Sequence, residues 1–177
     1  MWQPMADEPK KKKRSRTFTW DDPSEVVREG RRVSGAELFD KMRRGTIPPP
    51  PFAKLLGIEV FDSGEGRFTM TLLPQEFHYN PMGCVHGGIL STLLDSVMSA
   101  AVHTALPAGS KYLTANINVT FLRPIYEQTG EVLAEGRVIS IRNQLATAEG
   151  KIIDGKGNLC ATGTAVCMIQ DRLQPKL

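Results

Sequence analysis

Hydrophobic and polar residues alternate along much of the chain after residue 52, and this pattern is typical of β-strands with one buried face. Glycine-rich turns separate some of the runs, for example Ser63–Gly66 and Asp154–Gly157. The pattern predicts six strands: Ile58–Phe61, Arg67–Leu73, Leu113–Leu122, Gly130–Ile141, Leu145–Ile153 and Leu159–Met168.

One long stretch follows a helical period instead. In Leu90–Leu106 the apolar residues recur every three or four positions, which predicts a helix that Pro107 and Gly109 bring to an end. A single helix between two strands and four further strands indicates an α+β fold in which the long helix covers one face of an antiparallel sheet. The 177 residues are enough for one such domain with a substantial core.

The first 47 residues follow neither pattern. Ser34 and Glu37 fit a capping box, so we expect a short helix over Gly35–Arg44, with Gly45 at its end. Pro48–Pro51 then forms a stiff, extended spacer that either links two parts of the chain or braces the mouth of a binding site. We therefore predict an N-terminal extension (1–47), a main domain (48–170) and a C-terminal tail (171–177).

Charge separates the same regions. Residues 1–47 hold 12 Lys and Arg against 8 Asp and Glu, whereas the remainder holds 10 against 11. We expect Met1–Trp20, which includes the basic run Lys10–Arg14, to be a disordered or loosely attached tail. Such a run could also serve as an electrostatic arm for an anionic partner. The near-neutral core gives no reason to expect nucleic acid.

Other features bear on the compartment. The three cysteines are an odd number without a C-x-x-C pair, which argues against a disulfide framework or a zinc cluster. The chain starts with basic and polar residues rather than a secretory signal, and it has no run that is long and apolar enough for a membrane span. These features predict a cytoplasmic protein without a metal.

The densest chemical signal lies in Asn80–Asp95, a glycine-rich turn that leads into the apolar helix. Asp95 is the only formally charged residue between Gly87 and Ser110. A lone carboxylate on an uncharged helix is costly to bury unless it is satisfied or used. Eight residues upstream, Gly87 and Gly88 stand where the free N–H groups of a helix N-terminus can bind an anion or oxyanion.

These residues resemble a known family. The pattern Asn80-x-x-Gly83-x-x-His86-Gly87-Gly88, followed by Leu94-Asp95, is similar to that of the PaaI-type hotdog-fold acyl-CoA thioesterases. The segments 118–124 and 129–136 resemble later strands of the family, and the resemblance covers about residues 50–169. It implies a hotdog fold, in which a curved antiparallel sheet wraps a long central helix, and a homodimer or homotetramer with active sites between subunits.

The resemblance also implies a role for each residue of the site. The Gly87 N–H would polarise the thioester carbonyl of an acyl-CoA substrate, and Asp95 of the partner subunit would act as general base or nucleophile. Asn80 would hold the carbonyl or the attacking water, which a hydroxyl at Thr114 would orient. His86 would shape the turn and reach toward the substrate. No cofactor is implied beyond the coenzyme A of the substrate.

Two other functions stay open on the sequence. The chain could be a non-catalytic acyl-CoA-binding or regulatory hotdog protein, or a hydratase, although the Asp/His spacing of hydratases is not found here. The acyl group is not fixed by the sequence, and Leu90, Leu94, Met98 and Phe77 could line its tunnel or belong to the core.

One departure from the family is the turn 141–144, which has no glycine.

Overall fold

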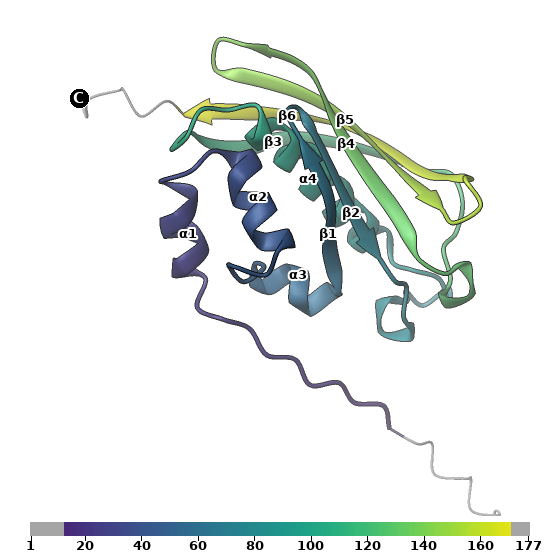
Figure 1. The fold of residues 1–177 in the computed structure, drawn as a ribbon. Coiled ribbons are helices and arrows are strands. Elements are labelled where there is room, and N and C mark those ends of the chain that lie inside the picture. Colours follow the sequence, from purple (N-terminus) through teal and green to yellow (C-terminus); the bar gives the residue numbers. More distant parts are fainter. Residues whose placement is uncertain (1–12, 171–177) are drawn as a thin grey trace, which may run out of the picture.

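The computed structural model describes residues 13–170 (Figure 1). The predicted C-terminal tail and the first residues of the basic run lie outside this range. The described chain forms helices α1 (Ser24–Gly30), α2 (Gly35–Arg43), α3 (Pro51–Leu56) and α4 (Gly87–Thr104), two single-turn 3-10 helices, η1 (Glu76–His78) and η2 (Glu127–Thr129), and strands β1 (Ile58–Gly64), β2 (Arg67–Leu72), β3 (Lys111–Phe121), β4 (Val132–Arg142), β5 (Leu145–Asp154) and β6 (Leu159–Gln170).

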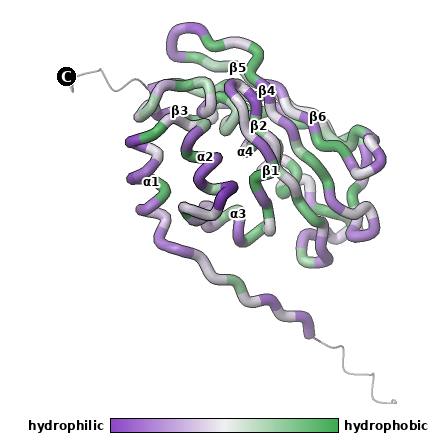
Figure 2. The backbone as a smooth tube through the Cα atoms, viewed as in Figure 1, coloured by the Kyte–Doolittle hydropathy of each residue, from purple (hydrophilic) through white to green (hydrophobic). Residues whose placement is uncertain are grey.

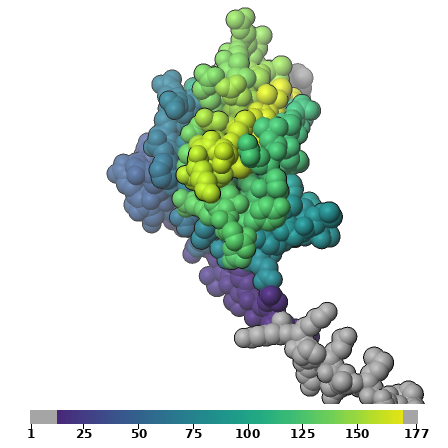
Figure 3. All heavy atoms as spheres, turned by 90° about the vertical axis from the view of Figure 1, so that its right-hand side faces the viewer, coloured from purple at the N-terminus to yellow at the C-terminus, as the bar shows by residue number. Residues whose placement is uncertain are grey.

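All six predicted strands are present and form one antiparallel sheet in the order β1-β2-β4-β5-β6-β3. The sheet is open, so β1 and β3 are its edges. Hydrophobic and hydrophilic residues alternate along its strands (Figure 2), as expected for strands with one covered face. The α+β prediction is therefore confirmed. Viewed from the side away from α1 and α2, strands β4 to β6 make up much of the surface (Figure 3).

Helix α4 lies across the covered face of the sheet. It begins at Gly87, three residues before the predicted start, because His86 caps it, and it ends at Thr104. Leu94, Val97, Met98 and Ala101 are fully buried against the strands. No helix within residues 13–170 has the length and hydropathy needed to cross a membrane.

Three glycines in register allow α4 to approach the sheet closely. Gly136 on β4 pairs with Gly150 on β5, which pairs with Gly163 on β6. A Cβ atom at Gly136 would lie 2.1 Å from the carbonyl oxygen of Val97, and one at Gly150 would lie 2.9 Å from Met98 Cγ. These distances leave no room for a side chain, so the glycine row sets the distance between helix and sheet.

Helix α2 packs beside β1 and α4, and α1 lies on the outer side of α2 (Figure 1). Helix α2 is confirmed, with the Ser34 hydroxyl accepting the N–H of Glu37. The ring of Phe39 lies 4.4 Å from that of Phe68. A Cβ atom at Gly35 would lie only 2.3 Å from the carbonyl oxygen of His103, so α2 approaches α4 as closely as the backbone allows.

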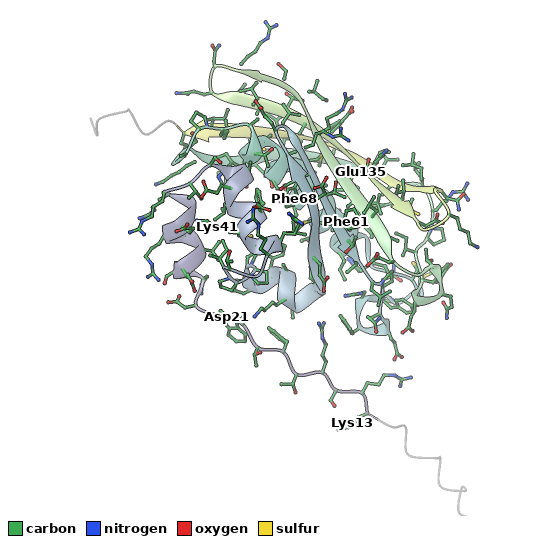
Figure 4. All side chains as sticks on the ribbon, viewed as in Figure 1. Lys13, Asp21, Lys41, Phe61, Phe68 and Glu135 are labelled. Carbon is green, nitrogen blue, oxygen red and sulfur yellow. The ribbon has the colours of Figure 1, made fainter. Side chains whose placement is uncertain are left out.

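Helix α1 was not predicted. None of its residues is buried, and Pro23 at its N-cap position makes no side-chain hydrogen bond, although Asp22 accepts the N–H of Ser24 at 2.9 Å. The helix therefore lacks the buried apolar face from which helices are recognised in a sequence. An ion pair between Glu29 and Lys41 joins α1 to α2, and Figure 4 shows Lys41 between these helices.

The described part of the basic tail contacts the folded domain. Arg16 donates a hydrogen bond of 2.7 Å to the carbonyl oxygen of Leu55, and its guanidinium lies 4.0 Å from the centre of the Phe77 ring. Arg14 pairs with Glu76. Arg14 and Arg16 therefore attach the extended segment to η1 and α3. The boundaries of the predicted extension and main domain stay a prediction.

The turn without glycine is accommodated by an asparagine. Asn143 has a φ of 54°, in the left-handed region that glycine usually fills. It follows Arg142, which pairs with Leu145 in the β4–β5 hairpin. Since asparagine tolerates this conformation better than most residues, the hairpin keeps its tight connection.

Candidate active site

The loop before α4 is shaped by Asn80. Its Oδ1 accepts the N–H of Met82 at 2.8 Å, and its backbone N–H donates to the carbonyl oxygen of Cys84 at 2.8 Å. Gly83 has a φ of 77°, which the tight turn requires. A bridge between Tyr79 and Val85 closes the loop. The amide of Asn80 is half-buried and directed into its own loop.

His86 caps the helix. Its Nδ1 accepts the N–H of Gly88 at 2.8 Å, and its own backbone N–H donates to the carbonyl oxygen of His78. The cap fixes the first turn of α4, where the helix dipole favours negative charge. His86 itself is exposed.

The Gly87 N–H is one of the free donors of this helix end. No hydrogen bond to it is found among the described residues. The ring of Phe121, at the end of β3, lies against Gly87, since a Cβ atom there would be 3.0 Å from Phe121 Cζ. A donor at a helix N-terminus beside an apolar ring can stabilise a developing oxyanion.

Asp95 lies two turns after Gly87 on α4, on a different face of the helix from the one that packs on the glycine row. The residue is half-buried, and its Oδ1 is buried without a hydrogen-bond partner among residues 13–170. Buried carboxylate oxygens are normally paired, and an unpaired one indicates a role in binding or chemistry.

The charge of Asp95 acts on two side chains of the sheet, Cys167 of β6 and Tyr112 of β3. Burial raises the pKa of the Cys167 thiol; a hydrogen bond with Thr114 opposes the rise and the charge of Asp95 adds to it. Burial likewise raises the pKa of Tyr112 to about 12. A hydrogen bond with Ser99 lowers this pKa, whereas electrostatic interactions with Cys167 and Asp95 raise it further. The Tyr112 hydroxyl therefore stays protonated at neutral pH.

Asp95 opens into a cavity of about 570 Å³. One wall is a face of α4 with Asp95, Ser96, Ser99 and His103, and the facing wall comes from α2, α3 and the two first strands. The interior is mostly apolar, as in sites that bind organic ligands. Phe68, labelled in Figure 4, and Phe39 contribute to it.

The predicted residues fall into two groups within one subunit. Asn80, His86 and Gly87 lie at or before the start of α4, whereas Asp95 lies near its middle. Thr114 lies on β3, where it pairs with Cys167 of β6. Eight residues at 1.5 Å per residue separate the Gly87 N–H from Asp95 by about 12 Å along the helix. A thioester carbonyl cannot contact both groups in the same subunit.

Sequence reasoning missed the cavity and several polar residues in it. Ser99 and His103 follow Asp95 at intervals of four, so helical spacing from Asp95 was a signal for them. Burial lowers the pKa of His103, which favours its neutral form. Tyr112 had no such signal, because it reaches the cavity from β3 through the fold.

The sequence left four residues open between the acyl tunnel and the core. Leu90, Leu94 and Met98 are core residues, and Phe77 is half exposed beside Arg16. Pro49 and Pro50 do line the cavity, as one interpretation of the proline run predicted. His78 is structural: its Nε2 lies 3.0 Å from the carbonyl oxygen of Leu56. Among residues 13–170, no cluster of His, Cys, Asp and Glu is suited to a metal ion.

Comparisons with known proteins agree with this geometry. The model of the thioesterase superfamily matches residues 82–161, from the loop through α4 to β6. Human acyl-coenzyme A thioesterase 13 is 27% identical over 110 residues, which are 58% of this chain and 78% of that protein.

Solved structures share the fold. A phenylacetic acid degradation-related protein from Ralstonia eutropha is 31% identical, with a TM-score of 0.66 over 73% of this chain and 98% of that one. The PaaI protein of Escherichia coli, at 20% identity, has a TM-score of 0.68 over 78% and 97% of the two chains, which shows a common fold.

The resemblance drawn from the sequence and the hotdog fold are both confirmed, as is the expected class of enzyme, a thioester hydrolase. The stretch that matches the family model includes the start of α4 and Asp95. The chain therefore belongs to the thioesterase superfamily.

Proposed function

We propose that this protein hydrolyses acyl-CoA thioesters to a free acid and coenzyme A. The observation that carries the proposal is the buried, unpartnered Oδ1 of Asp95 at the wall of an apolar cavity. The acyl-CoA substrate class is supported by the motif that contains Asp95 and by the name of the human relative.

In this reaction Asp95 acts as general base or as nucleophile. As a base, it removes a proton from water while the water oxygen attacks the thioester carbonyl carbon. The carbonyl oxygen then gains negative charge, and the carbon–sulfur bond breaks to release coenzyme A as its thiolate. A positioned carboxylate that takes up this proton in the transition state speeds the reaction by about 10²–10⁴-fold.

The Gly87 N–H is the proposed donor to the developing oxyanion. One such donor lowers a barrier of this kind by roughly 3–4 kcal/mol. Asn80, through its hydrogen bonds to Met82 and Cys84, shapes the loop that carries this donor, and His86 fixes the first helical turn. Thr114 is the proposed group that orients the water, because its hydroxyl bonds the Cys167 thiol, on which the charge of Asp95 also acts.

The separation of Gly87 and Asp95 supports a site that two subunits share. Strand β3 is a sheet edge, and edges of this length are normally covered. It exposes Leu113 and Phe121, the latter beside Gly87. Pairing of two β3 edges in a homodimer, or in a homotetramer of such pairs, would bring the second subunit to the oxyanion donor. We further propose that the enzyme works in the reducing cytoplasm and needs no cofactor.

A thiol-release assay with a graded panel of acyl-CoA thioesters tests the proposal. We expect hydrolysis by the wild type and its near-complete loss in Asp95→Asn, with an unchanged oligomer on gel filtration. Asp62→Asn, on the exposed part of β1, is the matched control. Binding of acyl-CoA without hydrolysis by the wild type would contradict the proposal and favour a binding protein.

A further inference from the structure

The N-terminal helices make up one wall of the cavity that contains Asp95. Val26 of α1, Phe39 and Met42 of α2, and the prolines that follow line it opposite α4. These residues precede the stretch 82–161 that matches the superfamily model. The wall is therefore built from a part of this chain outside that match, and it faces the residue with the proposed catalytic role.

This wall is held in a defined position. The ring of Phe39 lies 4.4 Å from that of Phe68 and 5.6 Å from that of His103. Gly35 meets the backbone of His103 with no space for a side chain. The ion pair of Glu29 with Lys41 ties α1 to α2. A wall fixed by packing at several points can exclude ligands by size.

The cavity has a polar side on α4, with Asp95, Ser99 and His103, and an apolar side opposite it. Apart from Asp95, its charged lining residues are Arg43 and Glu59, which are both exposed, and Arg43 is paired with Asp40 at 2.8 Å. These charges therefore sit at the rim. Phe39, Met42 and Phe68 provide apolar contact inside. This distribution suits an uncharged hydrocarbon chain attached to a reacting group near Asp95.

The length of the cavity limits that chain. Asp95 and His103 both line it, and eight residues of helix separate them by about 12 Å. An extended chain of roughly nine or ten carbon atoms covers this distance, with carbon–carbon bonds of about 1.5 Å. Met42 of α2 stands on the wall opposite this helical face.

We propose that the segment of residues 24–50 forms the outer wall of the acyl pocket and that Met42 sets the largest acyl group accepted. The preferred substrates are apolar, medium-chain acyl thioesters. This inference rests on the proposed function and adds to it the substrate class and the element that selects it.

The test compares two opposite changes at Met42 on a panel of straight-chain acyl-CoA substrates, from acetyl to palmitoyl. Met42→Trp fills the pocket, and Met42→Ala enlarges it. Each methylene that no longer fits is worth about a fourfold loss in kcat/KM. We expect Met42→Trp to lower kcat/KM at least about tenfold for octanoyl- and decanoyl-CoA relative to butyryl-CoA, and Met42→Ala to shift the optimum to longer chains.

Val27→Trp and Val27→Ala are the matched controls, since Val27 is on α1, is 53% exposed and is not part of the cavity lining. They should keep the wild-type profile, and inhibition by free coenzyme A should be the same in all variants. If Met42→Trp does not fold, as judged by circular dichroism, the profile of Met42→Ala decides.

Two results would overturn the inference, and they are distinguishable. Hydrolysis with the same chain-length profile in wild type and both Met42 variants would remove the N-terminal wall from the acyl pocket and leave the proposed function intact. The absence of hydrolysis by the wild type across the whole panel would overturn the proposed function, and the inference with it.

Discussion

One face of α4 packs on the sheet through Leu94, Val97 and Met98, all fully buried, whereas another face brings Asp95, Ser99 and His103 to a cavity. The first face meets a row of glycines at distances that leave no space. The second face carries polar side chains, and Asp95 Oδ1 among them is buried without a hydrogen-bond partner in residues 13–170.

The contrast shows how a single helix can be both a structural element and a support for chemistry. Close packing on one face fixes the helix. The side chains on the other face therefore keep their positions even though they make few contacts of their own. A change on the packed face should reduce stability, and a change on the cavity face should reduce activity. The following experiments test this division.

The largest expected effect is on activity, from Asp95→Asn. Loss of a general base typically lowers the rate by about 10²–10⁴-fold, whereas the amide keeps the shape of the side chain. We expect the free energy of unfolding to stay constant or to rise slightly, because a charge is no longer buried without a partner. Thiol release and thermal unfolding measure the two quantities.

Equal turnover in the variant and wild type would exclude Asp95 from the mechanism. A large fall in stability would show instead that the carboxylate supports the fold, and the division between the two faces of α4 would be wrong.

The packed face is tested by Gly136→Ala. The new Cβ atom would lie 2.1 Å from the carbonyl oxygen of Val97, so helix and sheet must separate. Overpacking usually costs about 1–3 kcal/mol, and a clash with backbone belongs at or above the upper end of that range. Denaturant unfolding measures the loss of stability.

Gly155→Ala is the matched control, because a Cβ atom there meets only the carbonyl oxygen of Glu131 at 3.9 Å. It should change stability by less than about 0.5 kcal/mol. Equal stability of the two variants would show that the glycine row does not set the helix position.

The same contrast explains what could be predicted from the sequence. Strands and the long helix follow from period-2 and period-3.6 patterns, and Asp95 was conspicuous because no other charge lies near it in the chain. The glycines in the sheet carried no such signal, since their alignment depends on the register of β4, β5 and β6.

The cavity could not be predicted for a related reason. Its walls come from residues 26 to 112, and their proximity is a property of the tertiary structure. Leu90 and Met98 were equally compatible with a core or a tunnel, because apolar spacing identifies a buried face without saying what covers it. Helix α1 had no buried face and was missed.

A smaller effect is expected from Thr114→Val, which removes the hydroxyl that hydrogen-bonds the Cys167 thiol near Asp95. A typical hydrogen bond contributes about 1 kcal/mol, so we expect a loss of stability of about that size. Because the water would lose a partner of about the same strength, turnover should fall by a factor of roughly ten at most. Thr120→Val, on the exposed part of the same strand, should change neither quantity. If both variants behave alike, the Thr114 hydroxyl has no part in the site.

The smallest effect concerns pH and His103 at the far end of the cavity face. Burial lowers the pKa of His103 below its usual 6.5, so the unfolded chain binds a proton more readily than the folded one. Stability should therefore fall as the pH drops through 6.5 toward the lowered pKa, by about 1.4 kcal/mol for each unit of difference between the two pKa values.

The pKa of His78 is lowered by burial too, so the wild type loses stability through both residues. In His103→Gln the difference in unfolding free energy between pH 7.5 and 5.5 should be smaller than in the wild type. An identical difference would mean that the cavity hydrates His103 well enough to keep its charged form, and the cavity face would be wetter than its apolar lining implies.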